Sequence, residues 1–219
     1  MESSIAKGTC EVDKVLGSML RVDMDYGAKW KGNARKVDAC RVFANGTVLD
    51  IGCAARQAEQ YCRGVYIGFD CRTVDRGRKP DVLGDAHLLP FKCKSFNTVL
   101  AFDVIEHLAR GDLFVSECTR ALEPNGKMLV TTSNGPRSPF ARADPTHISI
   151  YTAKTLRILL EKKGLRTVSC NVFNIHSRLL LPIRLLPGVL GEYLASRLVS
   201  EIFMIGIKQG PAKTYVVAR

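Results

Sequence analysis

The sequence predicts an α/β protein built on a doubly wound, mostly parallel sheet of seven strands. From residue 47 onward, short apolar segments alternate with helical patterns, which is typical of βαβ units and of a parallel sheet covered by helices on both faces. Hydrophobic residues make up 46% and charged residues 24% of the 219 residues, close to the average for globular proteins. We therefore expect a single globular domain with a large core.

The first half of the chain contains four expected strands. Residues 34–43 form a helix that leads into an apolar strand at 47–51, which ends at Gly52. A helical stretch then runs to Tyr61, and a second strand covers 65–69. Residues 82–83 form a short third strand, and the apolar run 99–102 forms the fourth.

The second half continues this rhythm. Phe114, Cys118, Ala121 and Leu122 follow helical spacing, and a turn at 124–126 leads into a fifth strand at 128–131. Thr152 has the side chain of an N-cap for a helix that presents leucines on one face and stops at Gly164; these are Leu156, Leu159 and Leu160. Residues 168–173 form the sixth strand. Either 202–207 or 214–218 is the seventh, and the pattern does not choose between them.

We divide the single domain into an N-terminal helical cap (1–46), a cofactor-binding core (47–173) and an acceptor-side segment of helices with a terminal strand (174–219). The first residues contain no apolar stretch of the secretory type, so we expect a cytoplasmic protein. The apolar region 179–207 is interrupted by charges and prolines, which argues against a membrane span. The eight cysteines include no C-x-x-C pair, so their spacing predicts no metal site.

The chain is basic, with 32 Lys and Arg against 21 Asp and Glu, a net charge of +11. This excess favours an anionic partner, which leaves RNA, an anionic membrane surface and an acidic small molecule open. The basic residues form two clusters, one before the first strand and one after the second: Lys29, Lys31, Arg35, Lys36 and Arg41; Arg72, Arg76, Arg78 and Lys79. No aromatic series for stacking bases accompanies them.

Carboxylates stand where the expected strands end. Asp50 and Gly52 close the first strand, Asp70 closes the second 20 residues later, and Asp103 follows the fourth. Ligands of open parallel sheets bind at these carboxyl ends, and an acid at the end of the second strand suits the hydroxyls of a ribose. The loop after Gly52 lacks the further glycines of a dinucleotide site, so NAD is disfavoured. S-adenosylmethionine, which has no phosphate and carries positive charge, fits better.

The sequence resembles the class I S-adenosylmethionine-dependent methyltransferases, within the group that contains the ubiquinone-pathway O-methyltransferases and related small-molecule enzymes. The resemblance covers about residues 45–170. It rests on the order and spacing of VLDIGCA (48–54), YIGFD (66–70), GDAHLLPF (84–91), SFNTVLAFDVIEHL (95–108), LEPNGKMLVTTSNG (122–135) and DPTHISIYTAKTLRILLEKKGL (144–165). It implies the Rossmann-like methyltransferase fold. Ala54 and Arg56 depart from the G-x-G-x-G loop of the family.

The resemblance also implies a set of cofactor-binding residues. Asp50 and Gly52 would line the methionyl end, Asp70 would hold the ribose, and Asp103 would stand near the methyl group. Asp85 and Ala86 would contact the adenine. The complete expected set is Asp50, Gly52, Cys53, Ala54, Asp70, Cys71, Asp85, Ala86, Phe102 and Asp103.

Three residues are candidates for catalysis: Glu106, His107 and His147. The histidines are candidate bases for a hydroxyl acceptor, although each has an alternative role as a structural hydrogen-bonding group. Asp103 and Glu106 have the spacing of a helix capping box, so Glu106 either caps a helix or faces the acceptor.

We therefore predict an S-adenosylmethionine-dependent methyltransferase with a small or lipophilic acceptor. The basic clusters leave an RNA methyltransferase open, and the altered loop leaves a non-catalytic cofactor-binding subunit open. The basic and leucine-rich end of the chain suits either a lid over a lipophilic acceptor or a surface that lies on anionic lipid. The sequence does not indicate the oligomeric state.

Overall fold

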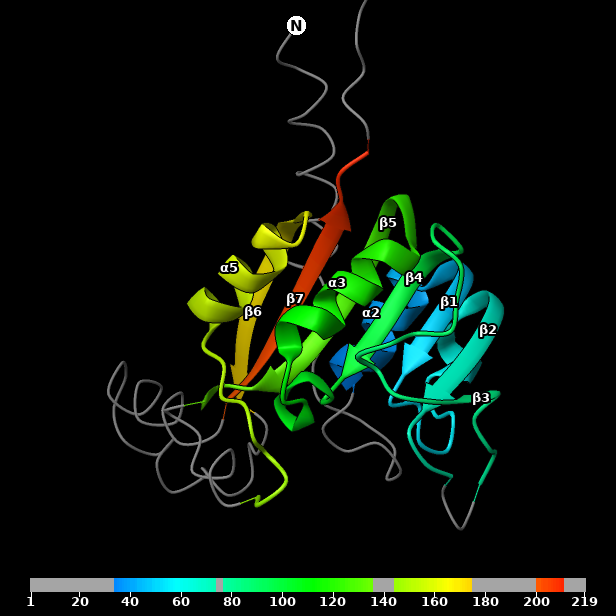
Figure 1. The fold of residues 1–219 in the computed structure, drawn as a ribbon, viewed down its shortest axis with the longest axis horizontal. Helices are drawn as coiled ribbons and strands as arrows, with labels where there is room; N and C mark the ends of the chain where they lie inside the picture. The colour runs from blue at the N-terminus through cyan, green and yellow to red at the C-terminus, as the bar shows by residue number, and fades with distance from the viewer. Residues whose placement is uncertain (1–33, 74–76, 136–143, 175–199, 211–219) are drawn as a thin grey trace, which may run out of the picture.

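A computed structural model describes residues 34–73, 77–135, 144–174 and 200–210. These residues form one seven-stranded sheet with the spatial order β3-β2-β1-β4-β5-β7-β6 (Figure 1). The strands are β1 (Asn45–Ile51), β2 (Arg63–Asp70), β3 (Val82–Leu83), β4 (Phe96–Phe102), β5 (Leu122–Ser133), β6 (Leu165–Asn174) and β7 (Ser200–Lys208). The helices are α2 (Ala34–Phe43), α3 (Gly111–Ala121) and α5 (Ala153–Lys162), with 3₁₀ turns η1 (Glu59–Tyr61) and η2 (Ile105–His107).

The sheet is parallel except at β7. Strands β3, β2, β1, β4 and β5 pair in parallel, whereas β7 lies antiparallel between β5 and β6. This arrangement confirms the predicted fold class. The 202–207 segment supplies the seventh strand, while 214–218 lies outside the described residues.

Helices cover both faces of the sheet. In Figure 1, α3 and α5 lie on the near face and α2 on the far face. The burial pattern of β1 explains this, because successive side chains of a strand point to opposite faces. Leu49 and Ile51 belong to the core under α3 and α5, whereas Val48 belongs to the core under α2. The side chains of both layers are buried, so the central strands are packed on both faces.

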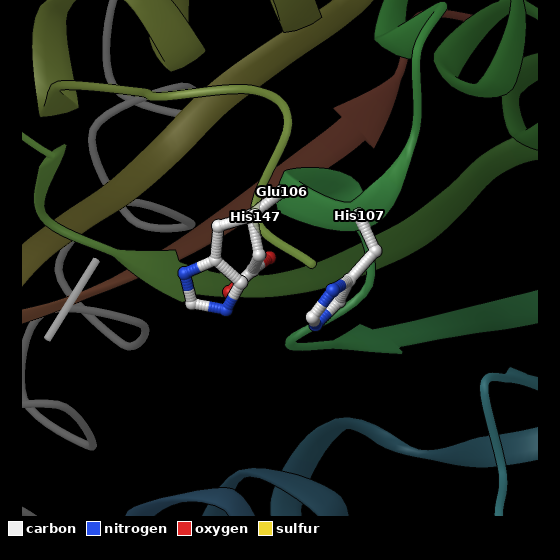
Figure 2. Close-up of side chains that lie close together, drawn as sticks. All are labelled: Glu106, His107 and His147. Atoms are coloured by element: carbon white, nitrogen blue, oxygen red, sulfur yellow. The ribbon is translucent and has the colours of Figure 1, made fainter. Parts of the chain in front are cut away.

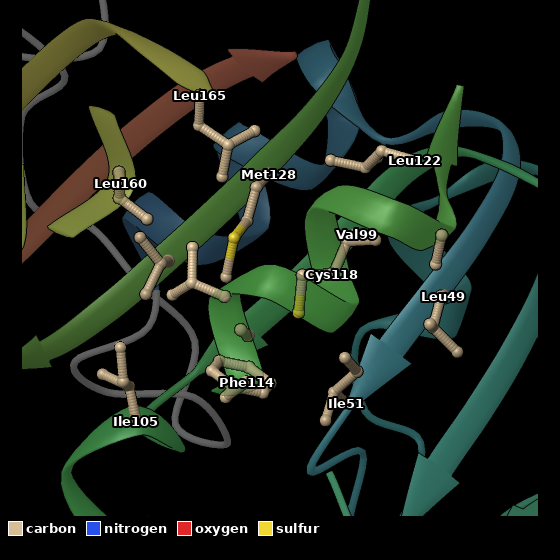
Figure 3. Packing of buried hydrophobic residues seen from close by; sticks show 14 of the residues in the cluster. Leu49, Ile51, Val99, Ile105, Phe114, Cys118, Leu122, Met128, Leu160 and Leu165 are labelled. Carbon is tan, nitrogen blue, oxygen red and sulfur yellow. The ribbon is translucent and has the colours of Figure 1, made fainter. Parts of the chain in front are cut away.

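The larger core layer joins the two helices to the central strands. Figure 3 shows Phe114 and Cys118 of α3 packed over Ile51 and Val99, with Leu160 of α5 on the same side of the sheet. Phe114 and Leu160 are completely buried, as their helical spacing predicts.

The predicted helix between Gly52 and Tyr61 is wrong. The segment forms consecutive turns and ends in the short 3₁₀ turn η1. Ala54 and Arg56 have φ angles of 45° and 59°, which are incompatible with a right-handed helix. The segment that was expected to be helical is therefore a loop of turns.

The predicted start and stop of α5 are confirmed. The Thr152 hydroxyl accepts from the Thr155 N–H at 3.1 Å, and the Thr155 hydroxyl accepts from the Thr152 N–H at 2.8 Å. Gly164 ends the helix with φ of 84°, a conformation that glycine adopts without steric cost.

The division into a cap, a core and an acceptor-side segment stays a prediction, because 1–33, 175–199 and 211–219 lie outside the described residues. Within the part of the chain that the structure covers, no helix is long and apolar enough to cross a membrane.

Replacing Thr152 by alanine should lower the free energy of unfolding by about 1 kcal/mol, because the first turn of α5 loses its cap. Urea denaturation with an unchanged m-value would measure this as a lower midpoint. Thr152→Ser keeps the hydroxyl and is the matched control. Equal losses in both variants would contradict the capping role.

Candidate active site

The register of the parallel strands brings the predicted cofactor residues to one edge of the sheet. Ile51 of β1 pairs with Phe69 of β2 on one side and with Ala101 of β4 on the other. The next residues along these strands, Gly52, Asp70 and Phe102, therefore leave the sheet at the same level. This edge lies beside the β1–β4 boundary, where the strand order reverses and ligands of doubly wound sheets bind.

The loop after β1 has the backbone of a glycine-rich loop although only one of its three key positions is glycine. Gly52, Ala54 and Arg56 have φ of 72°, 45° and 59°, all in the left-handed region. A Cβ on Gly52 would lie 2.4 Å from Cγ2 of Val104, so this position requires glycine for space as well as conformation. Ala54 and Arg56 adopt the conformation of the missing glycines at a cost of roughly 1–2 kcal/mol each.

Arg56 offsets this cost with its side chain, which points away from the loop. Its guanidinium pairs with Asp81 and with Glu59, and it lies 5.1 Å from the centre of the Tyr66 ring. Only 9% of the residue is exposed. Arg56, which departs from the family pattern, thus anchors the loop to the outer strands, and the loop backbone stays at the carboxyl edge.

Asp50 is a buried carboxylate next to this loop. It is 4% exposed, and its side chain accepts a hydrogen bond from the Tyr66 hydroxyl. Burial raises the pKa of Asp50 to about 7, the negative charge of Asp70 adds to the rise, and the Tyr66 hydroxyl and Arg56 oppose it. A cationic ligand beside Asp50 would favour its ionised form.

Asp70 connects the second strand to the loop. One carboxylate oxygen accepts from the Ala54 N–H at 2.9 Å, and the other accepts from the Arg72 N–H at 3.3 Å. The first contact orients the loop, which sequence reasoning had not assigned to Asp70. The carboxylate is only partly buried, so it remains accessible to a ligand.

The remaining predicted cofactor residues differ in their surroundings. Asp85 is exposed and accepts from the backbone N–H of His87 at 2.8 Å, whereas Ala86 is packed into the core. Cys71 is exposed and Cys53 is buried. Asp85 and Cys71 therefore have exposed side chains, whereas those of Ala86 and Cys53 are buried.

Asp103 is held by a buried lysine. Lys36 of α2 is 5% exposed, pairs with Asp103, and lies 2.8 Å from Glu201 of β7. Burial works to raise the pKa of Asp103, but the Lys36 ammonium and the Thr131 hydroxyl hold it below its usual range. Asp103 has φ of 55°, and these contacts fix this uncommon conformation.

Glu106, His107 and His147, which the sequence offered as separate candidates, lie together in the structure. Figure 2 shows Glu106 and His107 on η2, after β4, and His147 on the loop that precedes α5. The ligating atoms of the three side chains lie within 4.8 Å of one another. The two imidazole rings contact edge to face, with centroids 4.7 Å apart.

The capping-box interpretation of Glu106 is wrong. Val104 precedes η2 without a side-chain cap, and Asp103 points to Lys36 instead. The Glu106 carboxylate accepts from the Ser133 N–H at 3.3 Å, and burial together with the charge of Asp103 raises its pKa.

Backbone contacts fix the loop of His147 against η2. The N–H groups of Ile148 and Ser149 donate to the carbonyl of Glu106 at 3.0 and 2.9 Å. Nδ1 of His107 lies 3.1 Å from the carbonyl oxygen and 3.0 Å from the hydroxyl oxygen of Thr146. These contacts join residues that are 39 to 43 positions apart in the sequence.

Three expected members of the basic clusters are paired with acids, among them Arg41, which pairs with Asp38 at 3.7 Å. Lys36 is buried against Asp103, and Arg78 pairs with Glu59. Lys29, Lys31 and Arg76 lie outside the described residues. The described part of these clusters therefore gives no support to an RNA-binding face.

Sequence reasoning missed three residues of this edge: Tyr66, Lys36 as the partner of Asp103, and Glu201. Tyr66 had a detectable signal, because it lies two residues before the Gly68 that pairs with Asp50 and so shares the face of the sheet. The Lys36–Glu201 pair had none, since 165 residues separate its members.

S-adenosylmethionine fits the residues present. The edge offers a buried carboxylate for its positive charges, an accessible carboxylate for the ribose, and a left-handed loop that begins at Gly52, where a Cβ would meet the Val104 side chain. Asp50, Asp70 and the 52–56 loop would hold it.

Curated relatives match a little more than half of the chain. A probable S-adenosylmethionine-dependent methyltransferase of Mycolicibacterium smegmatis is 36% identical over 137 residues, covering 55% of this chain and 52% of the relative. A ubiquinone biosynthesis O-methyltransferase of Rhodopseudomonas palustris is 28% identical over 137 residues, covering 57% and 54%. The chain spans about half the length of these curated relatives.

Solved structures share the fold. An S-adenosylmethionine-dependent methyltransferase from Archaeoglobus fulgidus superimposes with a TM-score of 0.59 at 21% identity, covering 80% of this chain and 91% of that one. The Haemonchus contortus phosphoethanolamine N-methyltransferase 2, in complex with phosphomonomethylethanolamine and S-adenosylhomocysteine, gives 0.54 at 19% identity, covering 76% and 50%.

The family assignment follows from a third comparison. The model of the methyltransferase domain matches residues 31–170, which include the loop after β1, the acid at the end of β2 and the η2 turn. With more than half of its length matched, the chain belongs to the methyltransferase-domain family, among relatives that depend on S-adenosylmethionine.

Proposed function

We propose that the chain transfers a methyl group from S-adenosylmethionine to a hydroxyl oxygen of a small or lipophilic acceptor. The observation that carries this proposal is the Glu106–His107–His147 group, which stands at the carboxyl edge beside the cofactor residues. Such a group suits an acceptor whose proton must leave, which a free amine or a thiolate does not require. The O-methyltransferase names among the relatives support the same choice of atom.

In this proposal, one group of residues at the edge binds the cofactor and another receives the acceptor. S-adenosylmethionine supplies the methyl group on a positively charged sulfur and leaves as S-adenosylhomocysteine. Asp50 and Asp70 bind and orient it, and the buried sheet beneath excludes water from one side. The acceptor oxygen forms its bond to the methyl carbon as the carbon–sulfur bond breaks, and its proton leaves through the histidine group. Holding both reactants in line supplies up to about 7–11 kcal/mol in favourable systems.

The broad test incubates the protein with S-adenosylmethionine carrying a labelled methyl group and with extract separated into lipid, small-molecule, RNA and protein fractions. Label in the lipid or small-molecule fraction supports the proposal. Label in RNA alone contradicts the acceptor class, and cofactor binding without transfer to any fraction contradicts the activity.

Replacing Asp70 by alanine should weaken binding of S-adenosylhomocysteine by about 10–100-fold, because hydrogen bonds to a charged group contribute roughly 1.5–3 kcal/mol. Isothermal calorimetry measures this directly. Asp112→Ala, which removes a half-buried carboxylate on α3 that pairs with Arg110, is the matched control and should bind as the native chain does. An unchanged affinity in Asp70→Ala would remove Asp70 from the site.

Binding of S-adenosylmethionine should strengthen as the pH rises through about 7 and then level off. The pKa of Asp50 in the free chain is raised to about 7, so below this pH the ligand meets a neutral carboxyl group and above it a carboxylate. Asp50→Asn should give weaker binding without this rise. S-adenosylhomocysteine, which lacks the sulfonium charge, should show a smaller slope. A steep rise that persists in Asp50→Asn would assign the titration to another group.

His107→Ala and His147→Ala should each lower kcat by about 100-fold or more for a hydroxyl acceptor, since positioned proton-transfer groups contribute at least this much. Affinity for S-adenosylhomocysteine should stay within about twofold, because neither side chain belongs to the cofactor loop. Turnover within about threefold of the native rate in both variants would mean that positioning alone accounts for catalysis.

A further inference from the structure

We propose that Glu106, His107 and His147 bind a divalent transition-metal ion at the acceptor side of the edge. The set offers one carboxylate oxygen and two imidazole nitrogens, all within 4.8 Å of one another. Ligands of a tetrahedral ion, each about 2.0–2.1 Å from it, stand roughly 3.3 Å apart. Figure 2 shows the three side chains gathered at one place, so small side-chain rotations would bring their ligating atoms from the present distances to those of a bound ion.

The carboxylate of Glu106 lacks a partner for one of its oxygens. Glu106 is 2% exposed, and Oε1 accepts from the Ser133 N–H. The Thr132 hydroxyl faces this carboxylate, but neither it nor Oε2 of Glu106 makes a hydrogen bond of normal geometry with the described residues. A buried anionic oxygen without a donor is destabilising, and a coordinated cation would remove this penalty.

Contacts behind the histidines resemble those that orient metal ligands. Nδ1 of His107 faces the Thr146 carbonyl oxygen, so a proton on Nδ1 donates there and leaves Nε2 with its lone pair. Asp144 lies 3.7 Å from Nε2 of His147 and also accepts from the Thr146 hydroxyl at 2.6 Å. Metal-bound imidazoles commonly donate their other N–H to a carbonyl or carboxylate, which fixes the ring.

The donor set indicates the class of ion. Two imidazoles and one carboxylate suit zinc, iron, cobalt or manganese better than magnesium or calcium, which prefer oxygen ligands throughout. Three protein ligands leave at least one position open, as catalytic metal sites do. Asp103 is not available as a further ligand, because it is paired with Lys36 and Thr131.

The open position suits the acceptor, a step that rests on the proposed function. A hydroxyl oxygen on the cation would lose its proton to solvent near neutral pH, as zinc-bound water does with a pKa of about 7. With the ion bound, the two histidines would therefore promote the loss of this proton as metal ligands instead of accepting it themselves. The resulting oxyanion would then attack the methyl carbon while the carbon–sulfur electron pair goes to sulfur. This specifies the acceptor as one whose hydroxyl coordinates a metal, such as a phenol.

The test titrates the metal-depleted full chain with Co²⁺ and follows its visible absorption. We expect one equivalent to bind with nitrogen and oxygen ligation, and Mg²⁺ at the same concentration not to displace it. Because the chain has eight cysteines, thiolate-to-cobalt charge-transfer absorption would identify binding at a cysteine instead, and this would overturn the proposal.

Variants locate the ion. Glu106→Gln, His107→Ala and His147→Ala should each weaken Co²⁺ binding at least about tenfold, since even changes behind the ligands cost 10–100-fold in metal sites. His87→Ala, a histidine outside the cluster, should bind Co²⁺ as the native chain does. No saturable binding, or equal affinity in all four variants, would overturn the site.

Calorimetry with S-adenosylhomocysteine on the same samples separates this proposal from the proposed function. Variants that bind S-adenosylhomocysteine with native affinity are folded. Weaker Co²⁺ binding in such a variant then means that the replaced side chain is a metal ligand. Binding of S-adenosylhomocysteine without any Co²⁺ site overturns the metal and leaves the methyltransferase function. Binding of Co²⁺ without S-adenosylhomocysteine overturns the function and, with it, the acceptor role of the ion.

Discussion

The parallel register of β1 with its two neighbours is the constraint on which the site depends. Because Ile51 pairs with both Phe69 and Ala101, three strands end together and release their next residues at one edge. A shift of one residue in either pair would turn Asp50 or Asp70 to the opposite face of the sheet. The two fully buried core layers hold this register, so packing far from the edge determines where the acids stand.

The loop after β1 shows that a backbone conformation can persist when its usual residues are absent. Ala54 and Arg56 keep the left-handed φ angles that glycine would supply, and Asp70 holds the Ala54 N–H. The Arg56 guanidinium then joins the loop to Asp81 beside β2. These contacts of Asp70 and Arg56 therefore take the place of the conformational freedom of glycine. They hold the loop in its conformation before any ligand binds.

The sequence was sufficient for features that depend on local chemistry. The alternation of strands and helices, the cap at Thr152 and the acids at strand ends all come from short-range patterns, and the structure contains them. The helix predicted up to Tyr61 was wrong because a local pattern says nothing about a backbone held by Asp70 and Asp81. The pairing of Lys36 with Glu201 and the approach of His147 to Glu106 depend on the complete sheet, so no local pattern contains them.

Among the described residues, one buried carboxylate is paired with a cation and two are not. The two without a cation lie at different places on the carboxyl edge, one on the cofactor side and one on the acceptor side. Glu201 has the ammonium of Lys36 at 2.8 Å. Asp50 has only a tyrosine hydroxyl, and Glu106 only a backbone N–H, within hydrogen-bonding distance. The two buried acids without a cationic partner are therefore sites where a positively charged ligand would be stabilised. One lies beside the cofactor loop and the other beside two imidazoles, which matches a sulfonium on one side and a metal ion on the other.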